Sequence, residues 1–164
     1  MNLQTALRYM IPENSLTSEA GETSAAVTWI GMQQNAALKM TFHPASEAKR
    51  SVAMGASLKM QGMLPGIPDL VNPAIPFFLE MKAKRNVPSR YQAWWLINAI
   101  KYNILCGVAY NAEEAIAFFE GCIRFDVKNT LAHRRLLLMI EDWRKTEYSI
   151  DPWQSRSFAA RRGR

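Results

Sequence analysis

The chain has 164 residues, which is enough for one domain with a short appendage. Its hydrophobic fraction of 49% and charged fraction of 21% are ordinary for a globular protein with a packed core. The chain has no apolar run near the ~20 residues of a membrane span, and its first residues do not resemble a secretory signal. We therefore expect no membrane association. The net charge of +6 suggests a polyanionic partner without identifying it.

The first half of the chain predicts two helices and a strand. Thr17 or Ser18 can cap a helix whose first turn holds two acids. Alternating side chains over residues 37–42 predict a strand. Residues 45–61 are typical of a second helix, which a glycine then stops.

The second half alternates strands with helices. In order, it predicts a strand over 69–71, a strand over 77–82, a helix from 89, a strand over 104–110 and a helix over 112–122. This order indicates an α/β or α+β fold, with a mixed central sheet of about four strands flanked by helices.

A C-terminal extension follows. Asp126 or Asn129 can cap a helix that runs to about Lys145, and an irregular arm rich in arginine follows. We therefore divide the chain into a main domain over 1–125 and a basic helix and arm over 126–164.

The two cysteines, Cys106 and Cys122, lie far apart in sequence and are flanked by apolar residues. They form no C-x-x-C pair, and both histidines are distant in sequence. We expect buried free thiols in a reducing compartment, and hence a cytoplasmic protein.

The most informative residues are Asp69, Glu80 and Lys82. Asp69 follows a tight Gly-Ile-Pro turn, and the other two lie two apart on an apolar strand, where they share one face. Charged groups on a buried strand are costly to desolvate unless they are paired or functional. Two carboxylates and a lysine are the groups needed to hold Mg²⁺ and position a water against a phosphodiester. Taken alone, Asp69 could equally be an ordinary turn residue.

Around these residues the chain resembles a known family. The pattern G-x-P-D-L, ten residues, E-x-K, then a helix opening with S-x-x-Q, is similar to the VRR-Nuc branch of the PD-(D/E)xK nucleases. The resemblance extends from about residue 18 to 123. It implies the restriction-endonuclease-like fold, a Mg²⁺ or Mn²⁺ cofactor and a DNA substrate. The small size is typical of stand-alone, phage-encoded members, which would act in the host cytoplasm.

The resemblance also implies roles for single residues. Asp69 and Glu80 would bind the metal, and the backbone carbonyl of Met81 would complete its first shell. Lys82 would orient the attacking water, and Gln92 would reach that water or a phosphate.

The first helix of these nucleases usually offers one more acid to the metal. Glu19 and Glu22 are both candidates, and we favour Glu22 because it lies further into the helix. Either acid could instead only compensate the helix dipole.

Basic residues outside this motif are candidates for contacts with the DNA backbone. They are Lys84, Arg85, Lys49, Arg50, Lys59, Arg161 and Arg162. A solvated helix face is an equal explanation for those on the helix over 45–61.

The chain departs from the family pattern at two places. Phe42, His43 and Pro44 replace the loop that often carries an Asn-Gly pair, so we take His43 to be incidental. Asn103 stands where a glycine usually ends the glutamine helix, and asparagine is the next best residue for that left-handed position.

Two functions follow from these observations. The first is a metal-dependent DNA endonuclease, which the resemblance implies to be a homodimer that cuts branched DNA such as a Holliday junction or a flap. The alternative is a non-catalytic DNA-binding or protein-interaction module on the same fold. The C-terminal extension could serve a protein partner in either case.

Overall fold

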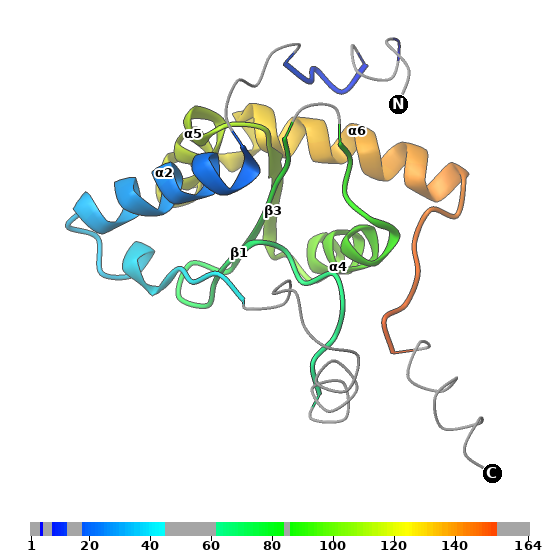
Figure 1. The fold of residues 1–164 in the computed structure, drawn as a ribbon, viewed down its shortest axis with the longest axis horizontal. Coiled ribbons are helices and arrows are strands. Elements are labelled where there is room, and N and C mark those ends of the chain that lie inside the picture. The colour runs from blue at the N-terminus through cyan, green and yellow to red at the C-terminus, as the bar shows by residue number, and fades with distance from the viewer. Residues whose placement is uncertain (1–3, 5–7, 13–17, 45–61, 84–85, 154–164) are drawn as a thin grey trace.

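A computed structural model describes residues 4, 8–12, 18–44, 62–83 and 86–153 (Figure 1). In chain order, the elements are α2 (Glu19–Met32), η1 (Leu38–Met40), β1 (Leu70–Asn72), β2 (Phe77–Met81), α4 (Arg90–Lys101), β3 (Leu105–Ala109), α5 (Ala112–Ile123), η2 (Val127–Asn129) and α6 (Leu131–Lys145). The predicted helix over 45–61 lies outside the described residues. None of the described helices has the length and apolar character to span a bilayer.

The described strands form one mixed sheet in the order β1-β2-β3. β1 runs antiparallel to β2, with Leu70 opposite Leu79. β3 runs parallel to β2, with Val108 opposite Glu80. The predicted mixed α+β class is confirmed, but the described sheet has three strands rather than four.

The prediction of a strand over 37–42 is wrong. Residues 38–40 form the 3-10 helix η1, and Phe42 alone makes a bridge to Val71. Asn72 explains the difference, because its side-chain amide donates to the carbonyl oxygens of Ala37 and Leu38, at 2.8 and 3.2 Å. These bonds hold the backbone in a turn beside β1, so it cannot extend along the strand.

Polar caps define where the helices begin. The Ser18 side chain accepts from the N–H of Gly21, which selects Ser18 over Thr17 as the cap of α2. The predicted cap of α6 is wrong: Thr130 fills that position and accepts from the N–H of His133. Asp126 and Asn129 bond to each other at the ends of η2 instead.

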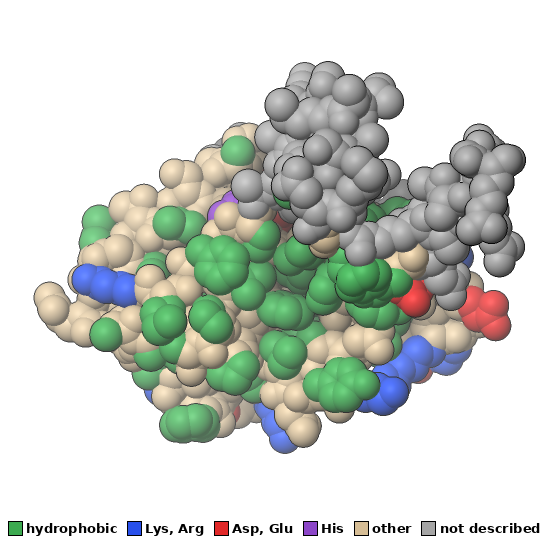
Figure 2. All heavy atoms as spheres, turned by 90° about the horizontal axis from the view of Figure 1, so that it is seen from below, with side chains coloured by type: hydrophobic (Ala, Val, Ile, Leu, Met, Phe, Trp, Pro, Cys, Tyr) green, Lys and Arg blue, Asp and Glu red, His purple; other side chains and the backbone are tan. Residues whose placement is uncertain are grey.

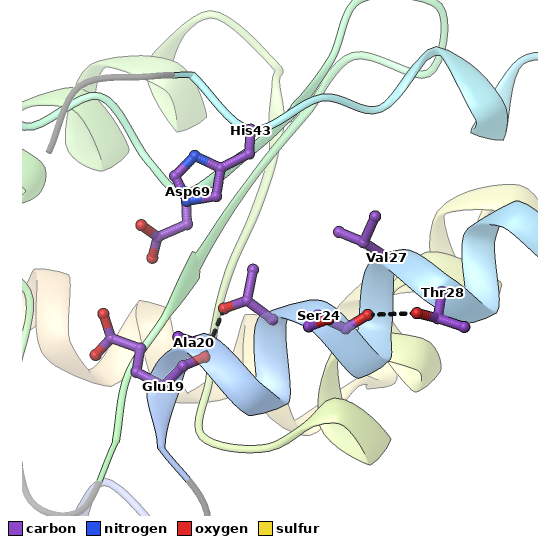
Figure 3. A pocket seen from close by; sticks show the side chains of 8 residues that line it. Glu19, Ala20, Ser24, Val27, Thr28, His43 and Asp69 are labelled. Carbon is purple, nitrogen blue, oxygen red and sulfur yellow. Dashed lines mark hydrogen bonds between the residues drawn. The ribbon is translucent and has the colours of Figure 1, made fainter. Parts of the chain in front are cut away.

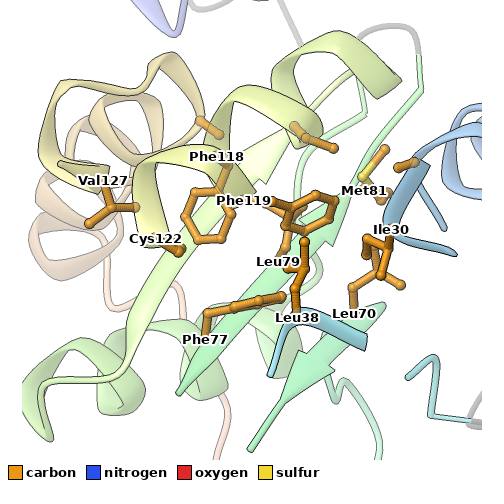
Figure 4. Packing of buried hydrophobic residues seen from close by; sticks show 14 residues of the cluster. Ile30, Leu38, Leu70, Phe77, Leu79, Met81, Phe118, Phe119, Cys122 and Val127 are labelled. Carbon is orange, nitrogen blue, oxygen red and sulfur yellow. The ribbon is translucent and has the colours of Figure 1, made fainter. Parts of the chain in front are cut away.

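Helices cover both faces of the sheet. α2 and α5 pack on one face, around Phe77 and Leu79 of β2 (Figures 1 and 4). Phe118 and Phe119 of α5 contact the ring of Phe77, with ring centroids 5.7 and 5.4 Å apart. Aromatic pairs at such distances favour tilted or edge-on arrangements, as observed here.

The opposite face is covered by α4 and α6, which pack around Cys106 and Val108 of β3. α6 supplies Leu136, Met139, Ile140 and Trp143 at helical spacing, and all four are buried. Residues 131–145 therefore belong to the main core of the molecule.

Arg135 is fully buried beneath this layer. Its guanidinium pairs with Glu114 of α5 and donates to the backbone carbonyl of Val108 in β3. It also donates to the carbonyls of Tyr9 and Met10, at 2.8 and 2.7 Å. One side chain thus joins α5, α6, β3 and the segment over 9–10. The sequence did not predict this network.

Candidate functional site

The tight turn that precedes Asp69 packs against the start of α4. Gly66 adopts φ +78°, and a Cβ on it would lie 2.4 Å from the Cβ of Tyr91. Only glycine tolerates both this backbone and this close approach. The indole N–H of Trp95 donates to the carbonyl of Pro65 at 3.1 Å and fastens the turn to α4.

Asp69 is the first of the predicted acids. It is 7% exposed, and its Oδ2 accepts from the backbone N–H of Met81 at 2.8 Å. This bond fixes the carboxylate against the end of β2. Met81 is fully buried, and its side chain packs in the core on the α2 and α5 face.

Glu80 is fully buried. Its Oε1 accepts from the ammonium of Lys82 at 2.5 Å and from the side-chain amide of Gln92. Its Oε2 has no hydrogen-bond partner among the described residues. Burial raises the pKa of the Glu80 carboxyl well above its usual value, and repulsion from Asp69 and Glu19 adds to that, against the opposing attraction of Lys82.

Lys82 lies at the end of β2 and is 8% exposed. Burial has the largest single effect and would lower its pKa, but the attraction and hydrogen bond of Glu80 together with the charges of Glu19 and Asp69 leave the pKa of Lys82 raised. The side chain is therefore held as an ammonium. Its Nζ also lies 3.8 Å from Oε2 of Glu19, so it stands between two carboxylates.

Gln92 closes a capping box with Ser89 at the start of α4 and also contacts Glu80. The Ser89 side chain accepts from the N–H of Gln92, and Oε1 of Gln92 accepts from the N–H of Ser89. The amide nitrogen of the same side chain is left to donate to Glu80. The S-x-x-Q motif thus anchors the buried carboxylate through the helix start.

The two acids of α2 point to different places. Oε2 of Glu22 accepts from the N–H of Ala112 at 2.7 Å, so Glu22 caps the start of α5. Glu19 faces Lys82. The structure therefore brings Glu19, and not the favoured Glu22, to the predicted site.

A divalent cation suits these groups by donor type. Oε2 of Glu80 is a buried carboxylate oxygen that no described residue bonds, and Asp69 and Glu19 contribute to the same negative field. Carboxylate oxygens are the ligands that Mg²⁺ and Mn²⁺ prefer. Within the described ranges, no three His, Cys, Asp or Glu side chains converge closely enough to hold an ion. A bound cation would thus also need water or backbone oxygens, as Mg²⁺ usually does.

A hollow of about 500 Å³ opens beside this site (Figure 3). Asp69 and Glu19 lie at one end of it, and the exposed face of α2 forms its wall. His43 also lines the hollow, near Asp69. The sequence assigned His43 no role. The bridge between Phe42 and Val71, which only the structure shows, brings this part of the chain beside β1.

The predicted DNA contacts are not on the described surface. Lys49, Arg50, Lys59, Lys84, Arg85, Arg161 and Arg162 all lie outside the described residues. Figure 2 shows one face of the molecule, where hydrophobic side chains gather over the middle and lysine and arginine side chains lie towards the margins. The described part of that face has no continuous basic track.

Asn103 adopts the left-handed conformation expected of it, with φ +60°, directly after α4.

Comparisons of the chain with models of protein families, with curated proteins and with solved structures found no match.

Proposed function

We propose that the protein is a metal-dependent endodeoxyribonuclease. The observation that carries the proposal is the buried Oε2 of Glu80, which has no hydrogen-bond partner among the described residues and lies beside Asp69 and Lys82. A buried carboxylate without a full set of partners is costly for stability. A cation bound by Glu80 and Asp69 would remove this cost, and this would explain why a carboxylate is buried here.

Each side chain has a separate task in this proposal. Glu80 and Asp69 would hold the cation, with Glu19 as the outer acid in place of Glu22. The cation, when bound, would supply charge stabilisation for the phosphodiester and lower the pKa of a water. Lys82, held as an ammonium, would orient that water and offset charge on the phosphate. Gln92 would fix the position of Glu80 through the capping box of α4.

The finer parts of the proposal rest on the family resemblance. They are the VRR-Nuc and restriction-endonuclease-like assignment, a homodimer, a branched DNA substrate and DNA contacts through the basic residues outside the described ranges. A cytoplasmic location is part of the same proposal, and the free, buried state of Cys106 and Cys122 supports it.

The test incubates the purified protein with supercoiled plasmid and with a synthetic four-way junction, in Mg²⁺, Mn²⁺ or EDTA. We expect cleavage in the metal lanes only, and its loss in Asp69→Asn, which keeps the shape of the side chain. Glu141→Gln is a control, because Glu141 is exposed and lies on α6. Circular dichroism of each variant confirms that it is folded.

Thermal unfolding in the same buffers gives an independent measure. A cation that binds only the native state adds about 2.7 kcal/mol to the free energy of unfolding when its free concentration is a hundred times its dissociation constant. We expect this gain in the wild type and not in Asp69→Asn. Uncut DNA in every metal lane would overturn the nuclease proposal, and DNA binding without cleavage would favour the non-catalytic module.

A further inference from the structure

The hollow beside Asp69 differs in chemistry from the site that it adjoins. Beyond the two acids at one end, its described lining consists of Ala20, Thr23, Ser24, Val27, Thr28 and His43. No lysine or arginine is among these residues. The two acids would repel a phosphate, and the described lining offers it no lysine or arginine, so the hollow suits an uncharged group.

The wall of α2 offers both apolar and polar contacts. The side chain of Val27 is exposed there although it is hydrophobic. The hydroxyl of Thr23 donates to the carbonyl of Glu19 at 2.7 Å, and that of Thr28 donates to the carbonyl of Ser24 at 2.8 Å. The hydrogen of each hydroxyl is already used in this bond, but the hydroxyl oxygen can still accept a hydrogen bond from a ligand N–H.

His43 adds a planar ring at the end near Asp69 (Figure 3). Its Nδ1 lies 3.0 Å from the carbonyl oxygen of Pro44, which fixes how the ring is turned. A ring of this kind can stack on a nucleobase, as aromatic side chains do in proteins that bind single strands.

We propose that this hollow binds the deoxyribose and base of one unpaired nucleotide next to the cleaved phosphate, an inference that rests on the proposed nuclease function. The volume of about 500 Å³ lies in the range of small-ligand pockets, about 300–1,000 Å³. A hollow of this size has room for a single nucleoside, and a base would have to leave the duplex stack to enter it. The preferred substrate is then DNA with an unpaired nucleotide at the cleavage point, and fully paired duplex is a poor one.

The first arm of the test uses thymidine, which carries no phosphate, in EDTA. We expect it to shift the NMR signals of the His43 imidazole C–H and the Val27 methyl groups. Ser24→Leu, which places a larger side chain in the hollow, should abolish these shifts. Ala25→Leu is the matched control, because Ala25 is exposed on the same helix but does not line the hollow. Signals that stay unmoved up to the solubility limit of thymidine would overturn the inference.

The second arm measures cleavage of a substrate with an unpaired nucleotide and of its fully paired counterpart. Ser24→Leu should raise KM for the first about tenfold, the loss expected for one stacked base, and Ala25→Leu should not. Cleavage that Ser24→Leu leaves unchanged would overturn the inference while the nuclease function stands. Thymidine binding without any metal-dependent cleavage would keep the nucleoside site and remove the nuclease function.

Discussion

The side-chain amide of Gln92, in the first turn of α4, donates to the carboxylate of Glu80 in β2, the central strand of the described sheet. The same side chain closes the capping box with Ser89. The start of α4 and the position of the buried carboxylate are therefore coupled through one residue.

Gln92→Ala tests this coupling. The change removes a hydrogen bond to a charged group, which contributes about 1.5–3 kcal/mol, as well as half of the capping box. Ser89→Ala removes a cap contact alone and should cost about 1 kcal/mol. Urea unfolding should show that Gln92→Ala is the more destabilising variant. Equal losses would mean that Gln92 acts only as a cap.

Lys82→Met tests the ion pair within the site. It leaves the Glu80 carboxylate buried without its cation, and we expect a loss of about 3–5 kcal/mol at pH 7. Adding Glu80→Gln should restore most of the stability, because the double variant no longer buries a carboxylate at position 80. A double variant as unstable as Lys82→Met would show that the loss does not come from an uncompensated charge on Glu80.

The loss in Lys82→Met should depend on pH. Burial raises the pKa of Glu80 in the folded state above its unfolded value of 4.5, so the folded protein prefers the protonated acid. Such a group contributes stability that is fully present below pH 4.5 and is lost as the pH rises towards the folded pKa. Denaturant unfolding of Lys82→Met relative to wild type should thus show a smaller deficit at pH 5 than at pH 7. A deficit that is constant across this range would contradict the assignment.

Gly66→Ala tests the turn before Asp69. The new methyl group would meet Tyr91 at 2.4 Å on a backbone with φ +78°, and we expect a loss of about 2–4 kcal/mol. Gly31→Ala is the control, since nothing lies within 4 Å of its Cβ position in α2, and it should gain about 0.5–1 kcal/mol. Thermal unfolding of the pair checks both signs.

Arg135→Met tests the buried guanidinium. It leaves Glu114 without its cation and frees two carbonyls of the segment over 9–10, at a cost of about 3–5 kcal/mol. Hydrogen exchange should also become faster at Ile11, which is buried in the core beside α6. Arg134→Met is the control, because Arg134 is the exposed neighbour on the same helix. Similar stability in both variants would show that the buried network contributes nothing net.

The two thiols give a prediction on reactivity. Burial raises the pKa of both Cys106 and Cys122 to about 12, so only about one thiol in 10⁴ is a thiolate at pH 8. An aromatic disulfide reagent should therefore modify both cysteines at least a hundredfold more slowly in buffer than in denaturant. Rapid modification of the native protein would contradict the burial of these residues.

The sequence predicts well those parts that depend on local patterns. The strand over 77–81 and the helices over 90–101 and 112–123 follow from runs of apolar residues between turn signals. The placing of Glu80 on the face towards α4, beside Gln92, agrees with the alternation of side chains along β2 and with the S-x-x-Q motif.

Contacts between distant segments are what the sequence could not supply. Asn72 decides the conformation of residues 37–40 from more than thirty positions away, and no pattern within 37–42 records this. Glu19 and Glu22 lie three apart on one helix, and the choice between them depends on how α2 is rotated against β2 and α5. The roles of His43 and Arg135 depend on tertiary packing in the same way.

The reach of Arg135 has a consequence for the order of folding. Its bonds to Tyr9 and Met10 join residues 126 and 125 positions apart, and Tyr9 also donates to Asp142, 133 positions away. Closing so long a loop costs entropy before any contact repays it. On the ribosome, the segment over 9–11 must wait until α6 has emerged. Residues 9–11 are thus synthesised before the sheet and α6 and yet are among the last described residues to pack, and the sheet with its carboxylates can form before Arg135 bonds to Tyr9 and Met10.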